Sequence, residues 1–255
     1  MKIVKLTLML CLCVCSFGLF AQDPAPLVKP EQTEYYEPKV RKVDAAAQVG
    51  NAPSDAIVLF DGKSLDKWER ADSAVHGTPA AWKLNGDGSM TVVPRSKGIR
   101  TKQLFGDCQL HIEWRSPIEP ATRQGQGRGN SGVFLQERYE VQVLNSRESP
   151  TYVNGQAGSI YKQTPPMVNA CRVEGEWNTY DIIFTAPRFR PNGSVEKPGY
   201  VTVMHNGIIV QNHFELQGST EYIGAPKWKA HGKGAIELQD HSNEVSYRNI
   251  WIREL

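Results

Sequence analysis

The stretch YVTVMHNGIIVQN (residues 200–212) decides the fold class of this 255-residue chain. The pair Asn206-Gly207 separates the runs VTVMH and IIVQN, both rich in β-branched residues. This pair favours a type I′ turn, because both central residues of that turn need a positive φ. A turn of this kind joins neighbouring antiparallel strands, so we predict a β-hairpin here.

Short apolar or alternating runs of the same kind fill the chain after Asp55, separated by turns that carry glycine, proline and asparagine. The runs are IVLF (57–60), QLHIEW (109–114), GVFLQ (132–136), YEVQVL (139–144), YDIIF (180–184), GAIELQD (234–240) and VSYRNIWI (245–252). No convincing amphipathic helix separates them and no repeat of fixed period occurs. The pattern therefore predicts one all-β domain, a sandwich or jelly roll, over residues 55–255.

The N-terminus is typical of an export signal. Lys2 and Lys5 precede an apolar run at residues 6–20, which ends at the small residue Ala21. That run is shorter than the roughly 20 residues a membrane-spanning helix needs. We therefore predict a cleavable signal peptide at 1–21, a periplasmic, secreted or cell-surface location, and no stable membrane span. A lipid-anchored form stays open as the alternative, although no small residue stands where one is expected before a lipidated cysteine.

The next segment, residues 22–54, is polar and contains several prolines, so we expect a tether or a surface strap. Removal of residues 1–21 takes away two lysines and no acidic residue, which brings the formal charge from +2 to neutral. A neutral chain does not indicate a nucleic-acid partner.

Only Cys108 and Cys171 of the five cysteines lie outside the predicted signal. They form either one disulfide or two buried thiols, and the sequence leaves both open. The six histidines show no metal-binding spacing, so no cofactor is predicted. A divalent cation stays open, because distant side chains can assemble a site in the folded chain.

The run YEVQVL contains the first candidate site. Strand alternation places Glu140 and Gln142 on one face, about 7 Å apart, with Tyr139 and Val141 on the other. A carboxylate and an amide at this spacing can hold sugar hydroxyls, and the carboxylate can exchange a proton if burial raises its pKa. The alternative is the solvated face of an edge strand.

The C-terminal stretch LQDHSNEVSYRNIWI (238–252) contains the second candidate site, with Gln239, Asp240 and His241 at the end of a strand and Arg248 on the last strand. Such side chains can orient, polarise and exchange protons. The alternative is an ordinary turn with a satisfied aspartate and an exposed histidine.

The glycines of RQGQGRGNSG (123–132) match a dinucleotide-binding spacing. They precede a strand and no helix follows, so the context that this motif needs is missing. A flexible loop, in which Asn130 and Ser131 offer hydrogen bonds, is the better interpretation.

Seven motifs occur together: LFDGKSLDKW (59–68), GNSGVFLQ (129–136), YEVQVLNS (139–146), GSIYKQTPP (158–166), EWNTYDIIF (176–184), NG (206–207) and LQDHSNEVSYRNIWI (238–252). In this order they resemble the 3-keto-disaccharide hydrolase domain family across residues 55–255. The resemblance implies a concanavalin A-like jelly-roll β-sandwich of two antiparallel sheets, with the site on the concave face. It also implies hydrolysis of 3-keto-glycosides that a partner sugar 3-dehydrogenase has oxidised.

Matched motif by motif, the resemblance implies Glu140 as base or acid and His241 as its proton-exchange counterpart. Arg248, or a bound cation, would stabilise the enolate of an elimination and hydration route. The residues that would hold substrate hydroxyls are Asn130, Gln142, Tyr161, Gln239 and Asp240. The chain departs from the common family pattern at Asn145, usually Asp, and at Ser242, usually Gly.

Two other functions fit the same residues. A jelly roll can also be a non-catalytic carbohydrate-binding module, because a fold does not fix a function. An ordinary glycosidase would need two facing carboxyl groups about 5 to 9.5 Å apart, and the sequence offers Glu140 no evident partner.

Overall fold

The computed structural model describes residues 29–72, 75–147 and 150–255, so the predicted signal at 1–21 lies outside the described residues. Val43–Leu255 form one compact unit, and the chain before it clusters separately. Of that earlier part, residues 29–42 contain one short 3-10 helix, η1 (Pro30–Thr33). Among the residues that the structure describes, none of the helices has the length and hydrophobicity that a membrane span requires.

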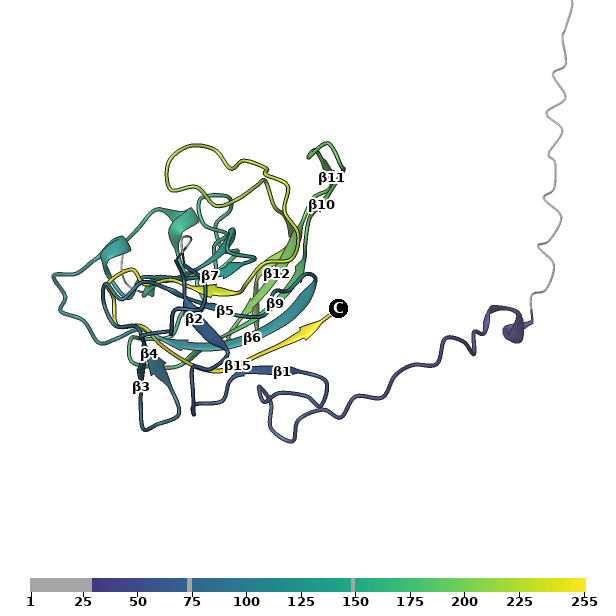
Figure 1. Cartoon of the computed structure of the whole chain (residues 1–255), viewed down its shortest axis with the longest axis horizontal. Coiled ribbons are helices and arrows are strands. Elements are labelled where there is room, and N and C mark those ends of the chain that lie inside the picture. Colours follow the sequence, from purple (N-terminus) through teal and green to yellow (C-terminus); the bar gives the residue numbers. More distant parts are fainter. Residues whose placement is uncertain (1–28, 73–74, 148–149) are drawn as a thin grey trace, which may run out of the picture. The chain divides into compact units, whose positions relative to one another are not determined.

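Two antiparallel sheets build the compact unit (Figure 1). The larger contains, in order, β13 (Ile208–Glu215), β12 (Tyr200–His205), β9 (Asn178–Thr185), β6 (Cys108–Arg115), β15 (Ser246–Glu254), β4 (Met90–Thr91) and β3 (Lys83–Leu84), with β1 (Ile57–Phe60) beside β15. The smaller contains β2 (Trp68–Arg70), β5 (Ile99–Thr101), β14 (Glu237–Leu238), β7 (Ser131–Leu135) and β8 (Tyr139–Val143). The predicted jelly-roll sandwich is confirmed.

Three short elements complete the unit. A two-stranded hairpin joins β10 (Arg188–Phe189) to β11 (Val195–Lys197). Two 3-10 turns, η2 (Gly125–Gly127) and η3 (Val153–Gly155), lie in the loops before β7 and after β8.

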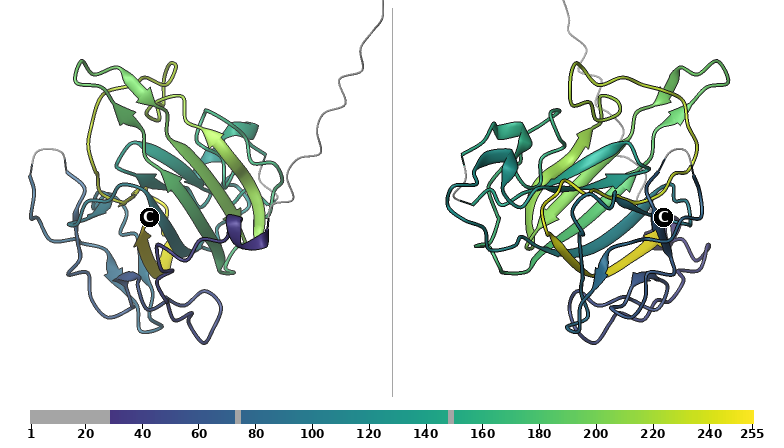
Figure 2. Two further views of the ribbon diagram at one scale, coloured as in Figure 1. Left: turned by 90° about the vertical axis from the view of Figure 1, so that its right-hand side faces the viewer. Right: turned by 60° about the vertical axis from the view of Figure 1, so that its left-hand side comes forward.

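The hairpin predicted from the opening stretch is present as β12 and β13 (Figure 2). Asn206 and Gly207 have φ values of 53° and 78°, as a type I′ turn requires. The Asn206 side chain also accepts a hydrogen bond from the Thr179 backbone N–H at 2.9 Å. The turn is thereby tied to the neighbouring strand β9.

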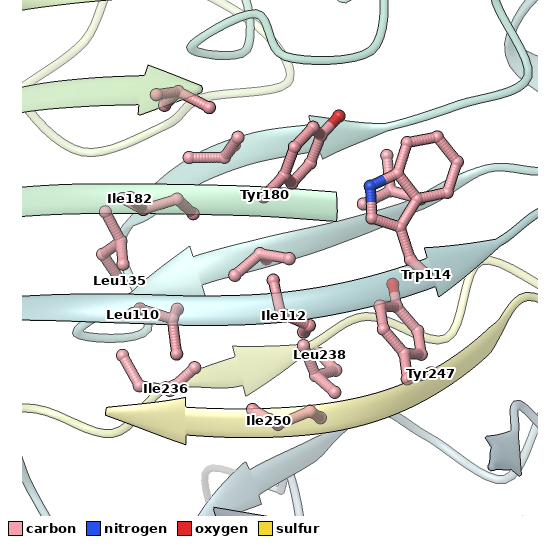
Figure 3. Close-up of a cluster of buried hydrophobic side chains, with 14 of the residues drawn as sticks. Leu110, Ile112, Trp114, Leu135, Tyr180, Ile182, Ile236, Leu238, Tyr247 and Ile250 are labelled. Atoms are coloured by element: carbon pink, nitrogen blue, oxygen red, sulfur yellow. The ribbon is translucent and has the colours of Figure 1, made fainter. Parts of the chain in front are cut away.

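The core lies between the two sheets and is built by strand alternation. Leu110 and Ile112 of β6 face Leu135 of β7 and Leu238 of β14 across the interior (Figure 3). All four are fully buried. Burial of each side chain of this size contributes about 1.5–3 kcal/mol, so the core explains why these alternating runs fold as a sandwich.

Two buried tyrosines of the larger sheet fix the smaller sheet by hydrogen bonds. The Tyr180 hydroxyl donates to the Gln142 carbonyl, and the Tyr247 hydroxyl donates to Ser131 Oγ, each at 2.7 Å. A buried hydroxyl without a partner would destabilise the fold, so these bonds specify how the sheets align. The strands that they fix, β7 and β8, also form the floor of the candidate site.

Cys108 and Cys171 are both buried free thiols. Of the two alternatives that the sequence left open, the structure therefore contains the unbridged pair.

Residues 43–54 pack on the domain, although the sequence placed them in the tether or strap. The Gly50 carbonyl accepts hydrogen bonds from Asn249 Nδ2 at 2.9 Å and from Trp251 Nε1 at 2.8 Å. This part of the predicted strap therefore covers strand β15.

Under that segment lies a buried ionic cluster around His111, which is 2% exposed. Its Nδ1 is 2.7 Å from Asp181 Oδ1, its Nε2 is 3.8 Å from Glu113 Oε1, and its ring stacks on Trp251. Burial acts to lower the pKa of His111, but the bonds to Asp181 and Glu113 outweigh it and raise that pKa to about 9.

This cluster predicts a stability that depends on pH. The pKa of His111 in the folded chain, about 9, lies above its ordinary value of 6.5. The extra stability is therefore fully present below pH 6.5 and is lost as the pH rises through about 9. As the pH rises from about 6 to about 9.5, we expect the unfolding free energy to fall by on the order of 2 kcal/mol, because His111 loses its proton.

Urea unfolding at both pH values, with Asp181→Asn beside the wild type, isolates this contribution. The variant should lose less stability over the interval than the wild type does. Equal losses would contradict a protonated His111 in the folded chain.

Candidate functional site

A pocket of about 550 Å³ opens on the face of the five-stranded sheet opposite to the core. Six residues predicted from the sequence line it together: Asn130, Glu140, Gln142, Tyr161, Gln239 and His241. Another hollow, of about 480 Å³, lies beside Lys83, Arg115 and Glu244 and contains none of those predicted residues. The gathering of acid, amide and phenol groups places the candidate site in the first pocket.

Strand β7 brings the two predicted segments together. It pairs with β8 on one side and with β14 on the other. The pairing with β7 continues past the last residue of β14, where the Gln239 N–H donates to the Gly132 carbonyl at 3.0 Å. The YEVQ and LQDH segments are therefore separated by a single strand and share one pocket.

Glu140 lies at the base of the pocket and is only 4% exposed. Alternation sends Tyr139 and Val141 into the core, which leaves Glu140 and Gln142 on the pocket side. With its amide nitrogen turned to the sheet, Gln142 donates to Glu140 Oε1 at 3.1 Å. Burial, with added repulsion from Glu237, raises the pKa of Glu140 to about 8.

The outer edge of β8 is covered rather than solvated. The Tyr161 N–H donates to the Glu140 carbonyl at 3.1 Å, and the Gln142 N–H donates to the Ser159 carbonyl at 3.0 Å. On the same strand, the Glu140 N–H donates to Thr220 Oγ1 at 3.0 Å. The alternative of a solvated edge strand is therefore excluded for this segment.

Gly132 leaves the space that the Glu140 carboxyl group occupies. A Cβ atom on Gly132 would lie 2.4 Å from Glu140 Oε1 and 2.9 Å from Phe134 Cε2. Both distances are shorter than real contacts, so a side chain at this position would force the buried Glu140 carboxyl group or the Phe134 ring to shift.

We expect Gly132→Ala to destabilise the fold by about 1–3 kcal/mol, because the new methyl group overlaps the Glu140 carboxyl group. The cost should be clearly smaller when Glu140→Ala is also present. Urea unfolding of the wild type, both single variants and the double variant measures this coupling. An equal cost in both backgrounds would contradict the proposed role of Gly132.

An amide wall closes one side of the pocket. Asn130 Nδ2 donates to the Gln126 backbone carbonyl at 2.8 Å. Gln126 Nε2 donates in turn to the Gly155 carbonyl of η3 at 2.9 Å. Amides held in this way present fixed donors and acceptors to sugar hydroxyls.

A tyrosine pair and a lysine form the opposite side. The Tyr152 and Tyr161 hydroxyls are hydrogen-bonded at 2.5 Å, and burial raises the pKa of Tyr161. Lys162 donates to the Tyr222 carbonyl, and its ammonium group lies 4.4 Å from the centre of the Tyr222 ring. Lys162 has a φ of 58°, a left-handed backbone conformation, and it lines the pocket together with Tyr161.

Arg248 does not belong to this pocket, contrary to its predicted role. It lies on β15 of the larger sheet, where Nε donates to Glu113 Oε2 at 2.6 Å. Its guanidinium group stacks on Trp177 at 4.1 Å. The C-terminal segment turns between Asp240 and β15 and leaves the pocket, so residues eight positions apart reach different sheets.

Asp240 is also outside the lining and stabilises a turn. Its Oδ2 accepts from the Lys97 N–H at 3.1 Å, and its Oδ1 accepts from the Ser242 N–H at 2.8 Å. The predicted contact of Asp240 with substrate hydroxyls is therefore replaced by a role in holding the loop that presents His241.

The remaining lining residues were not predicted: Gln126, Phe134, Tyr152, Lys162, Thr220 and Tyr222. Phe134 lies in the motif GNSGVFLQ, on the same strand face as Gly132, so strand alternation could have indicated it, and Lys162 directly follows the predicted Tyr161. Tyr152, Thr220 and Tyr222 come from loops, whose course no local pattern fixes. In the described ranges, no three His, Cys, Asp or Glu side chains gather as metal ligands.

Comparison with known proteins agrees with the fold and the motif order. The family model for the 3-keto-alpha-glucoside-1,2-lyase-like domain matches residues 55–253. The chain belongs to this family. A 3-keto-disaccharide hydrolase from Bacteroides thetaiotaomicron is 24% identical, over 80% of each chain.

Solved structures of similar proteins have the same fold as this chain. A crystal structure of a "putative glycosyl hydrolase" from Parabacteroides distasonis ATCC 8503 has a TM-score of 0.82 and 51% identity, over 89% of this chain and 97% of the other. A second protein from the same strain, at 20% identity and a TM-score of 0.59 over 84% and 100% of the chains, shares the fold.

The two residues that depart from the common family pattern, Asn145 and Ser242, have different surroundings. Ser242 has a φ of 61°, a conformation that glycine adopts without strain. Asn145 lies outside the pocket, where its Nδ2 donates to Glu174 Oε2 at 2.9 Å. Neither side chain lines the pocket around Glu140.

Proposed function

We propose that this protein is a glycoside hydrolase-type enzyme that cleaves 3-keto-glycosides, including 3-keto-disaccharides, by elimination and hydration. The observation that carries the proposal is Glu140, a buried carboxyl group with a pKa raised to about 8, at the base of a pocket lined by amides and phenols. Family membership and the named hydrolase relative support it.

The reaction needs an acidic hydrogen, a base and a leaving group. A ketone at C3 acidifies the hydrogen on C2, which the base removes. The C1–O bond then breaks, the glycosidic oxygen leaves with a proton, and a C1=C2 enone remains. Water adds its oxygen to C1 and a proton to C2, so the products are the free 3-keto sugar and the alcohol of the second half.

In this proposal the Glu140 carboxylate is the base. Its raised pKa makes it a stronger base than an ordinary carboxylate. His241 exchanges protons with solvent at the rim, and Lys162 takes the cationic role at the enolate that Arg248 cannot fill. Asn130, Gln142, Tyr161 and Gln239 hold hydroxyl groups.

The rival function is a carbohydrate-binding module that uses the same pocket without chemistry. The amide wall would serve binding equally well. Burial of a carboxyl group that forms no ion pair in the described ranges is costly, however, and binding of neutral sugars gives no reason for that cost. The position of Glu140 therefore favours catalysis.

Incubation of the purified protein with 3-keto-trehalose and with trehalose distinguishes the two functions. We expect turnover of the ketone only. Glu140→Gln should lower kcat by at least about 10²-fold, because it keeps the shape and removes the base. Glu196→Gln, on the exposed hairpin strand β11, is the matched control and should retain wild-type activity. Binding of both sugars without turnover would establish the module instead.

The pH profile tests the role of Glu140. Its pKa lies above the ordinary 4.5 because burial favours the neutral form, so the active carboxylate forms only as the pH rises. We expect kcat/KM to increase with pH and to reach half its limit near pH 8. A profile that falls through this range would assign Glu140 as an acid.

Arg248→Lys tests whether Arg248 lies outside the catalytic pocket, as its position on β15 indicates. The variant keeps the charge next to Glu113 and changes nothing in the pocket. Its kcat should stay within about twofold of the wild type, whereas a loss as large as that of Glu140→Gln would return Arg248 to the site.

We further propose that the enzyme acts after export, on sugars oxidised by a partner 3-dehydrogenase. The sequence pattern at residues 1–21 supports export. An oxidation at C3 must precede the elimination, since an unoxidised sugar has no acidic C2 hydrogen.

A further inference from the structure

One row of side chains crosses the five-stranded sheet. Glu69 of β2 pairs with Arg100 of β5, and Arg100 pairs with Glu237 of β14. Glu237 pairs with Phe134 of β7, which pairs with Glu140 of β8. Directly paired residues point to the same face of a sheet. The row therefore extends from the proposed base across the whole pocket-side face.

The first half of the row is a closed ionic cluster. The buried Arg100 guanidinium donates to Glu69 at 2.8 Å and to Glu137 at 3.0 Å, and lies 2.6 Å from His76 Nδ1. The hydrogen bonds of this cation are thus taken up by its own neighbours. It fixes Glu69 and Glu137 and leaves Glu237 as the next acidic group toward the pocket.

Glu237 has no such partner. Within the described ranges its carboxyl group forms no hydrogen bond or ion pair, although it is half-buried. Burial and the nearby Glu137 raise its pKa to about 7, against the opposing effect of Arg100. A carboxyl group in such a place is satisfied best by hydroxyl groups from outside the chain.

Phe134 lies between the two acidic positions. It is partly exposed, lines the pocket, and folds over Gly132 beside Glu140. Glu140 and Glu237 stand on strands about 9–10 Å apart, which is two strand spacings. An aromatic ring flanked by two carboxyl groups suits a sugar, whose C–H face packs on the ring while its hydroxyls donate outward.

We propose that Phe134 and Glu237 form a subsite for the second sugar of a 3-keto-disaccharide, next to the oxidised ring at Glu140. The inference rests on the proposed function and deepens it. The ring of Phe134 supports the apolar face of the leaving sugar, and Glu237 accepts hydrogen bonds from its hydroxyls. A small aglycone such as a methyl group does not extend as far as Glu237.

The test compares two substrates, 3-keto-trehalose and methyl 3-keto-glucoside, for the wild type, Glu237→Gln and Phe134→Leu. Glu237→Gln keeps the size of the side chain and removes its charge, and Phe134→Leu keeps an apolar side chain and removes the aromatic ring. Each variant should raise KM for the disaccharide about tenfold more than KM for the methyl glucoside, a difference of roughly 1.4 kcal/mol of binding. Because Glu237 contributes to the raised pKa of Glu140, the kinetics are compared on the upper plateau of the pH profile, where Glu140 is ionised in the wild type and in both variants. Glu196→Gln is the charge-matched control and should leave KM and kcat/KM for both substrates unchanged.

Each outcome has a distinct meaning. If the wild type cleaves both ketones and the variants affect them equally or not at all, the subsite is wrong and the proposed function stands. If the wild type cleaves neither ketone, the proposed function is wrong and the subsite falls with it. Circular dichroism spectra matching the wild type establish that each variant is folded.

Discussion

The burial of strand β8 on both faces is the constraint on which the site depends. Tyr139, Val141 and Val143 fill the core, and the opposite face, with Glu140 and Gln142, lies under the pocket loops. A strand buried in this way cannot solvate its acidic residue, so the fold itself raises the pKa of Glu140. The chemistry proposed for the protein follows from this arrangement.

The larger sheet supports the site without contributing a residue to it. Tyr180 and Tyr247 reach through the core and hydrogen-bond to β8 and β7, which holds the smaller sheet in register. The opposite surface of the larger sheet carries its own ionic cluster around His111, closed by the segment before β1. The His111 cluster and the pocket proposed for chemistry thus lie on different faces of one sandwich.

The pocket combines fixed amides on one side with phenols and a lysine on the other. Gly132 creates the space that Glu140 fills, and Phe134 continues the same face toward Glu237. A polar surface of this kind, on a rigid sheet and flanked by loops, is suited to a hydroxyl-rich ligand, whose many weak contacts require preorganised partners.

The sequence by itself determined the fold class, the hairpin at Asn206-Gly207 and the shared face of Glu140 and Gln142, because turn chemistry and strand alternation are local properties. It could not determine which strands become neighbours. Sheet order alone brings Gln239 and Glu237 beside β7, and the turn after Asp240 alone sends Arg248 to the other sheet. Long-range pairing, which no local pattern encodes, decided which of the predicted residues meet.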